Sequence, residues 1–360
     1  MTDLATAALE AYLKEAFGSD AVLLHVGRIG RPEEQGMKAL GYGKPLLVRF
    51  RAGGRERETV LSTMRGDKYG HQFYWDRAAI LLFQYETSAA LERHVKPLGV
   101  GYVDARGGLT PLHEPVEFFI LNEKLEGHDY FKDLERIRGG DFRPSDEALA
   151  REFARWLARI HAAGKDDPDL YYRAVRNLIG SDECIMGLID EAFPHPYPDF
   201  PEQRFLDMEK RVIDWRWKLK RYSHRLRAVH GDFHPWNVLV DDAGGFRVLD
   251  RSRGEWGEPA GDVCTMAMNY LLFGLYNEPR LSGAFERLYR VYFEEYLSLT
   301  NDHEALEVMA PFFVFRGLVV ASPEWYPNHP PAVRRGLLRF LLNVLEDEVF
   351  DWEHVNRYME

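Results

Sequence analysis

Three polar residues in the second half of the chain have the types and spacing that phosphoryl transfer requires. Asp232 stands five residues before Asn237, and Asp250 ends an apolar run that follows a Gly-Gly pair. The sequence around them reads as strand, loop, strand, turn and strand. One carboxylate can accept the proton of an incoming hydroxyl, while an amide and a second carboxylate hold Mg²⁺ against nucleotide phosphates. The pattern predicts Asp232 as the base and Asn237 and Asp250 as metal ligands.

Each of these residues also has a structural interpretation. Asp232 could be a turn residue, Asn237 a loop-bracing amide and Asp250 a cap at the end of a strand. The flanking His, Gly and Asn favour the catalytic interpretation of Asp232. His234 is close enough to the base to contact substrate or phosphate, and Trp236 is expected to pack under the loop.

The elements that must position these residues change in character along the chain. Segments typical of strands occupy residues 21–26, 46–51, 58–64 and 117–125, and helical segments occupy residues 4–17 and 75–94. Apolar spacings of three and four then predict helices over residues 146–161, 202–222, 262–273, 284–299, 304–320 and 332–349. Pro- and Asp-rich segments at 165–170 and 193–201 are expected to be loops. We therefore expect an α+β fold with a small β-rich N-terminal nucleotide-binding lobe over residues 1–124. A larger, mainly helical catalytic and acceptor-binding lobe would cover residues 125–360.

Composition describes a globular protein of 360 residues with 46% hydrophobic residues, long enough for two lobes with separate cores. Its two cysteines, Cys184 and Cys264, cannot form a disulfide framework and fit a reducing compartment. The first residues lack a secretory signal pattern, and the longest apolar run, 263–276, is too short to cross a bilayer. We expect a cytoplasmic protein.

Net charge is -11, and residues 125–360 carry all of it, with 30 basic and 41 acidic side chains. An acidic second lobe argues against nucleic acid or membrane as a partner and favours a cationic or neutral small acceptor. Solubility alone explains this charge equally well.

Several motifs resemble those of the aminoglycoside phosphotransferase and choline kinase-like family, relatives of protein kinases that mostly phosphorylate small molecules. The resemblance spans roughly residues 40–320 and is strongest at His230-Gly231-Asp232 with Asn237 and Asp250. The segment 257–262 is similar to the family's Gly-Asp-Pro-x-x-Asp, residues 122–127 to its hinge between lobes, and residues 157–161 to its helix ending in Leu-His. In this chain Arg251-Ser252 follow Asp250, where a Trp-Glu or Phe-Gly type pair is more usual.

The resemblance implies a two-lobed protein-kinase-like fold that uses ATP and Mg²⁺. It also implies that His230 and Asp262 are structural, as braces of the catalytic loop. A cation should contact the nucleotide's α- and β-phosphates, and Arg65, paired with Glu86 of the long helix, is the preferred candidate. Arg49, Lys44 and Lys68 are alternatives, and the phosphate-covering flap falls at 27–30 or 36–43. Adenine is expected near Glu123 and Leu125.

The acceptor is expected to be a small hydroxylated molecule, but its identity stays open among aminoglycosides, amino alcohols, sugar derivatives and other metabolites. The helices that begin near Glu202 and Ala284 are expected to line its pocket. Four carboxylates could pair with an amine of the acceptor or could simply solvate the surface: Glu255, Glu258, Glu294 and Glu295.

Three other classes compete with a small-molecule kinase. His230-x-Asp232 could be two-thirds of an iron(II) site completed by His303 or His329, although the helical periodicity opposes this. A protein Ser/Thr kinase would carry Ala-Pro-Glu after Asp250, which is absent here. A non-catalytic nucleotide-binding pseudokinase is opposed by the presence of Asp232, Asn237 and Asp250 together.

Overall fold

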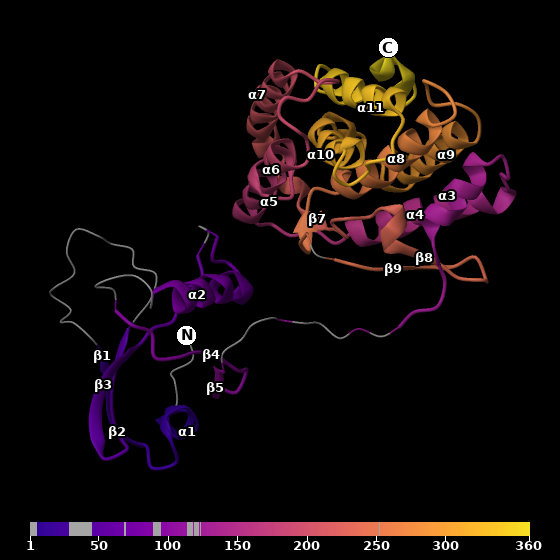
Figure 1. Cartoon of the computed structure of the whole chain (residues 1–360). Coiled ribbons are helices and arrows are strands. Elements are labelled where there is room, and N and C mark those ends of the chain that lie inside the picture. Colours follow the sequence, from indigo (N-terminus) through magenta and orange to yellow (C-terminus); the bar gives the residue numbers. More distant parts are fainter. Residues whose placement is uncertain are drawn as a thin grey trace. The chain divides into compact units, whose positions relative to one another are not determined.

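The chain forms two compact units, Met1–Asn122 and Glu123–Glu360. The computed structural model (Figure 1) describes residues 6–28, 45–67, 70–88, 95–113, 118, 122, 124–251 and 253–360. The roles that the sequence assigns to the lobes 1–124 and 125–360 stay predictions. No helix within the described ranges combines the length and the apolar character needed to cross a bilayer.

A three-stranded antiparallel sheet dominates the first unit. Strand β2 (Leu46–Ala52) lies between β1 (Val22–Arg28) and β3 (Arg55–Leu61). The turn from β2 to β3 uses Gly53 and Gly54, both with positive φ, as a tight hairpin turn requires. Helix α1 (Thr6–Phe17) covers one face of the sheet. Its residues share a small core with β2, formed by Leu9, Leu13, Ala21, Val48, Phe50 and Ala52.

The rest of the first unit contains one long helix and a second hairpin. Helix α2 (Tyr74–Ser88) occupies the segment in which the sequence predicts a helix, while β4 (Val100–Val103) and β5 (Leu109–Leu112) form a hairpin that it does not predict. The strand expected at 117–125 falls mostly outside the described residues. Residues 124–126, which are described, are not in a strand.

The second unit is mainly helical, so the expected α+β fold is confirmed. Its helices are α3 (Tyr130–Arg138), α4 (Pro144–His161), α5 (Pro168–Gly180), α6 (Ile185–Glu191), α7 (Glu202–Leu219), α8 (Ala260–Leu275), α9 (Gly283–Thr300), α10 (Ala310–Ala321) and α11 (Pro331–Val344). Short 3₁₀ turns occupy Lys220–Arg225, Pro235–Asn237, His303–Glu307 and Val355–Met359. The loop expected at 165–170 is confirmed for residues 165–167 but is wrong for residues 168–170, which belong to α5. Asp167 caps α5 by accepting a hydrogen bond from the Leu170 amide, and Pro168 begins that helix.

Helix α8 forms the centre of this unit. Every residue of α8 except Gly261 is buried. The helix lies between α9 and α10 (Figure 1) and also contacts α3, α4 and α11. A helix that is buried on all sides has little freedom to shift, because each neighbour would have to repack. The residues at its N-terminus are therefore held in place by the core.

Two small sheets carry the loop with the predicted chemistry. Strand β7 (Arg227–Ala228) pairs with β10 (Trp256–Gly257), and β8 (Val238–Val240) lies between β6 (His128–Asp129) and β9 (Phe246–Val248). The predicted hairpin β8–β9 is confirmed. Residues 229–237 connect β7 to β8, so both ends of the loop are anchored by strand pairing.

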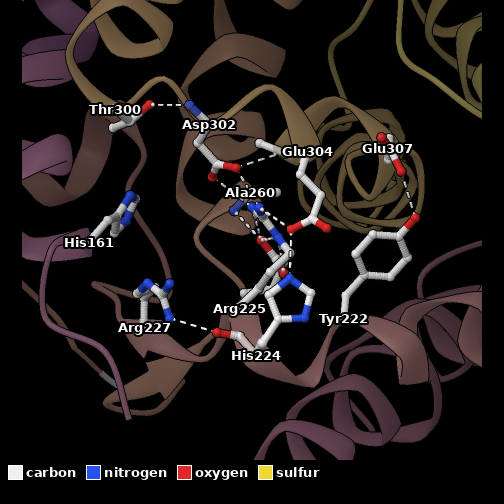
Figure 2. Close-up of polar contacts among 12 residues, drawn as sticks. His161, Tyr222, His224, Arg225, Arg227, Ala260, Thr300, Asp302, Glu304 and Glu307 are labelled. Atoms are coloured by element: carbon white, nitrogen blue, oxygen red, sulfur yellow. Dashed lines mark hydrogen bonds and ion pairs between the residues drawn. The ribbon is translucent and has the colours of Figure 1, made fainter. Parts of the chain in front are cut away.

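A buried ion-pair network fixes the segment that leads into α8. Arg225, with 4% of its surface exposed, donates from Nη2 to Glu258 at 2.8 Å and to Asp302 at 2.8 Å. Figure 2 shows Asp302 and Glu304 around this guanidinium. Tyr171 of α5 donates a further hydrogen bond to Glu258 at 3.0 Å. Glu258, one of the four carboxylates considered for an amine, is thus already paired inside the protein.

Replacing Glu258 should destabilise the protein far more than replacing the outer member of the same network. Glu258→Ala leaves the buried Arg225 with fewer counter-charges, so we expect a loss on the order of 3 kcal/mol in the free energy of unfolding. Glu304 is a matched control because its side chain is 40% exposed. Glu304→Ala should cost about 1 kcal/mol or less. Urea unfolding measures both, and equal losses would contradict this view of the network.

Candidate active site

The carboxylate of Asp262 holds the loop that carries Asp232. Its Oδ2 accepts a hydrogen bond from the His230 amide at 2.7 Å, and its Oδ1 accepts one from the Gly231 amide at 2.8 Å. His161, at the end of α4, places Nε2 3.2 Å from Oδ2 and Nδ1 2.9 Å from the Tyr296 hydroxyl. Asp262 is only 1% exposed. The expectation that it braces the catalytic loop is confirmed.

His230 is also structural, as expected. Its Nδ1 accepts a hydrogen bond from the Asp232 amide at 3.3 Å, which turns the chain sharply after Gly231. Gly231 has φ of 92°, a conformation that side-chain-bearing residues rarely adopt. The ring of His230 lies among Trp156 and Phe233. Backbone and packing together fix the position of Asp232.

The Asp232 carboxylate is 7% exposed and lies among three nitrogen groups. His234 Nε2 is 3.6 Å and Arg253 Nε 3.5 Å from Oδ2, and Arg316 Nη1 is 3.8 Å from Oδ1. No hydrogen bond to Oδ1 forms among the described residues. Oδ1 itself is buried, so an incoming hydroxyl can reach only the 10% of the Asp232 side chain that stays exposed, where the carboxylate can accept its proton.

Hydrogen bonding sets the tautomer of His234. Its Nδ1 accepts a hydrogen bond from the Trp236 amide at 3.2 Å, so the proton of the neutral ring is assigned to Nε2, the atom nearer Asp232. Burial lowers the pKa of His234, and the opposing charge of Asp232 does not cancel this effect. His234 is therefore neutral near pH 7 and presents a dipole to the carboxylate.

Asp232 stays ionised despite its burial. Burial alone would raise its pKa, but His234, Arg316 and Arg253 outweigh it and lower the pKa to about 2. A carboxylate of this kind is a weak base. It can orient a hydroxyl in the ground state and take the proton late, which suits the loose transition state of phosphoryl transfer.

Asn237 and Asp250 flank the open end of the β8–β9 hairpin. The Asn237 carbonyl accepts a hydrogen bond from the Leu249 amide at 2.9 Å, so Asp250 follows directly after this cross-strand pair. Asn237 Nδ2 donates to the Asp232 carbonyl at 3.1 Å, which leaves the amide oxygen available. Asp250 is exposed and has φ of 53°, a strained conformation for a non-glycine residue.

These donor atoms fit Mg²⁺, because amide and carboxylate oxygens are its preferred protein ligands. Within the described ranges, no group of three or more His, Cys, Asp or Glu residues is arranged to hold a metal. A site at Asn237 and Asp250 would therefore take its other ligands from nucleotide phosphates and water. The same observation opposes an iron(II) triad of His230 and Asp232 with His303 or His329.

The predicted nucleotide contacts divide between the two units. Arg65 and Glu86 are both exposed in the first unit, where no ion pair joins them. Leu125 is half-buried in the second unit, and Glu123 lies outside the described residues. All four stay predictions.

Of the alternative residues for the phosphate-binding cation and the flap, the structure bears only on Arg49. Arg49 pairs with Glu58 across β2 and β3, which leaves it less suited to bind phosphate. Lys44, Lys68 and the glycines at 36–43 lie outside the described residues.

A pocket of about 300 Å³ opens beside Asp232. Its lining comes from the loop 229–237, from the segment between β9 and β10, from α6 and its preceding residues, from α10 and from the segment after α10. The lining residues are Glu183, Leu188, Asp232, His234, Trp236, Arg253, Arg316, Val319, Trp325 and Tyr326. None of them belongs to α7 or α9, so the expectation that the helices from Glu202 and Ala284 line this pocket is wrong. Glu295 of α9 instead pairs with Arg155 of α4.

Sequence reasoning missed Arg316 and Arg253. Arg316 is the one charged residue in the apolar helix α10. A single charge in an apolar helix could have been recognised from the sequence as a candidate site residue. Arg253 carried no comparable signal, because a charged residue in a loop is ordinary.

Neutralising Asp262 should loosen the catalytic loop. In Asp262→Asn one carboxylate oxygen becomes an amide group that cannot accept a backbone hydrogen bond. We expect a loss of about 1–3 kcal/mol in unfolding free energy from the unsatisfied amide, measured by urea unfolding. Asp214→Asn, at an exposed site on α7, is the matched control and should stay within about 0.5 kcal/mol of wild type. Identical stability of the two variants would contradict the role of Asp262.

Comparison with known proteins shows which family the chain matches. Residues 83–307 match the phosphotransferase enzyme family (APH), which is well over half of the chain. No curated protein sequence matches.

Solved structures with some similarity include kinases of small molecules. A glucosamine kinase in complex with glucosamine, ADP and inorganic phosphate is 17% identical with a TM-score of 0.34. That match covers 63% of this chain and 56% of the glucosamine kinase chain. The choline kinase from Streptococcus pneumoniae is 14% identical with a TM-score of 0.35, and the match covers 94% of this chain and 99% of that chain. A spectinomycin phosphotransferase in complex with ADP and spectinomycin is 12% identical with a TM-score of 0.32, and coverage is 96% and 98%.

The family match confirms the resemblance carried by His230-Gly231-Asp232, Asn237 and Asp250. An antiparallel sheet followed by a mainly helical unit agrees with the protein-kinase-like fold that the resemblance implied. The chain belongs to the phosphotransferase enzyme family.

Proposed function

We propose that this phosphotransferase uses ATP and Mg²⁺ to phosphorylate a hydroxyl group of a small molecule. The observation that supports this most strongly is the Asp232 carboxylate. It is ionised, has an oxygen without a hydrogen bond, and lies at the wall of a pocket of about 300 Å³. A pocket of this size suits a small molecule better than a folded protein substrate.

In the proposed reaction the acceptor hydroxyl lies against Asp232. Its oxygen forms a bond to the γ-phosphorus of ATP while the bond from that phosphorus to the β–γ bridging oxygen breaks. ADP leaves, and the hydroxyl proton passes to the Asp232 carboxylate and then to solvent. The weak basicity of Asp232 means that this proton moves late, after the phosphorus–oxygen bond to ADP has loosened.

Asn237 and Asp250 would hold the metal on the nucleotide side of the site. Bound Mg²⁺ would neutralise charge on the phosphate oxygens. The bond from Asn237 Nδ2 to the Asp232 carbonyl links a metal ligand directly to the loop of the base. Acceptor and nucleotide would thereby be aligned by one short, rigid segment.

The remaining nucleotide contacts belong to the same proposal. Arg65 would contact the α- and β-phosphates, Glu86 would hold that cation, and adenine would lie near Glu123 and Leu125. These assignments rest on the motif resemblance and on the need for a positive charge on the phosphates.

Removal of the Asp250 carboxylate should weaken Mg²⁺-dependent nucleotide binding. For Asp250→Ala we expect the dissociation constant of Mg·ATP to rise roughly tenfold or more, the size of effect seen even for outer groups of metal sites. Calorimetric titration with Mg²⁺ and then with EDTA measures this. Asp242→Ala, at an exposed turn of the same hairpin, is the matched control and should bind like wild type. If Asp250→Ala binds Mg·ATP as tightly as the control, the metal assignment fails.

Replacing the base should slow turnover without preventing nucleotide binding. Asp232→Asn keeps the shape of the side chain but cannot take the proton, so we expect acceptor-dependent ADP release to fall about 10²–10⁴-fold. Calorimetry should show that Mg·ATP affinity changes little. Wild-type turnover in this variant would remove Asp232 from the mechanism.

A further inference from the structure

Arg316 is a buried cation without adequate partners. It projects from α10 with 3% of its surface exposed, and its nearest counter-charge is Asp232, 3.8 Å away. Its Nε and Nη2 atoms have no hydrogen-bond partner among the described residues. Leaving buried donors of a charged group without hydrogen-bond partners is costly, so a protein seldom retains them without a use. This guanidinium belongs to the lining of the acceptor pocket.

Arg253 adds a second positive charge to the same pocket. Its Nε lies 3.5 Å from Asp232 Oδ2, and its guanidinium sits over the Phe315 ring at 5.2 Å. Glu183 also approaches Arg253, but the Glu183 side chain is 77% exposed and is therefore strongly screened by solvent. The lining therefore contains two guanidinium groups and two carboxylates, Glu183 and Asp232, so its formal charges balance. Two donors of Arg316 nevertheless lack hydrogen-bond partners among the described residues, and Arg253 brings further donors beside Asp232.

Aromatic side chains form the remaining wall. Trp236 stacks on Phe131 with ring centroids 5.2 Å apart and meets the edge of Tyr326 at 5.8 Å. Tyr326 stacks in turn on His329 at 4.8 Å. Trp325, also in the lining, is 63% exposed. Apolar walls with charged groups at one end are typical of sites that orient a small molecule by its polar end.

We propose that the acceptor is a hydroxylated small molecule that carries an anionic group, a carboxylate or a phosphate, which the guanidinium groups of Arg316 and Arg253 bind. This inference rests on the proposed function, because it places the acceptor hydroxyl at Asp232. A guanidinium offers several donors in a plane and suits both kinds of anion. A protonated amine has no acceptor and could not satisfy the unpartnered donors of Arg316. The carboxylates first considered for an amine lie outside the pocket lining.

Four compounds with one carbon skeleton form the test: D-gluconate, glucose 6-phosphate, glucose and glucosamine. Each is titrated at constant ionic strength, with and without Mg²⁺ and a non-hydrolysable ATP analogue, and melting temperature and binding heat are measured. We expect at least one of the two anions to raise the melting temperature by about 3 °C at ten times its dissociation constant. Glucose and glucosamine should have no such effect. Which anion binds identifies the group as carboxylate or phosphate.

Variants of Arg316 test whether its guanidinium group binds the anion. Arg316→Met should weaken anion binding about tenfold or more, the value of a hydrogen bond to a charged group. Arg316→Lys should restore part of it. Because Arg316→Met also removes a counter-charge of Asp232, the melting temperature of each free variant is measured beside its binding. If Arg316→Met does not fold, Arg253→Met takes its place and should likewise weaken anion binding. Arg280→Met, exposed and distant in sequence, is the control and should bind as wild type does.

Several results would overturn the inference: preferential binding of glucosamine, binding of neither anion, or equal anion binding by Arg316→Met and wild type. Loss of anion binding in the presence of the ATP analogue would also overturn the inference. It would mean that the arginines bind the phosphoryl group of the nucleotide and not the acceptor. Failure of the proposed function is distinguishable. In that case the protein does not bind Mg·ATP, whereas the Arg316-dependent anion effect persists.

Discussion

The two hydrogen bonds from the His230 and Gly231 amides to the Asp262 carboxylate are the constraint on which the active site depends. Asp262 can hold the loop because it begins α8, a helix that the core encloses on nearly every side. The Arg225–Glu258 pair fixes the segment just before that helix. Core packing, a buried ion pair and two backbone hydrogen bonds thus form one continuous support for Asp232. A buried carboxylate that is fully hydrogen-bonded supplies stiffness that a flexible loop could not.

Charge in the pocket serves two purposes that partly oppose each other. His234, Arg316 and Arg253 keep Asp232 ionised in a buried site, but the same groups make it a weak base. Phosphoryl transfer tolerates this, because its transition state needs positioning and charge stabilisation more than strong proton abstraction. An anionic acceptor would pair with the Arg316 donors that Asp232 leaves unsatisfied. Catalysis and the choice of acceptor would then both depend on Arg316 and Arg253.

The sequence alone predicted those features that depend on residues close together in the chain. Asp232 and Asn237 share one loop, the β8–β9 hairpin is marked by its glycines, and Asp262 opens a helix with clear apolar spacing. The charge environment of Asp232 was not predictable, because Arg316 lies 84 positions further along the chain and approaches Asp232 only through the packing of α10. The pocket was assigned to α7 and α9 because amphipathic helices look alike before their partners are known. Helix α9 buries its apolar side against α4 and α8 instead.

Isotope transfer would show whether a phosphoryl group passes to a small molecule at Asp232. Wild-type protein and the Asp232→Asn variant would each receive ATP labelled with ¹⁸O in the γ-phosphoryl group, together with a small-molecule extract, and products would be identified by mass spectrometry. We expect a labelled phosphorylated molecule that also carries an anionic group and forms only with wild type. Label found only in inorganic phosphate, only on protein, or equally with both proteins would contradict it.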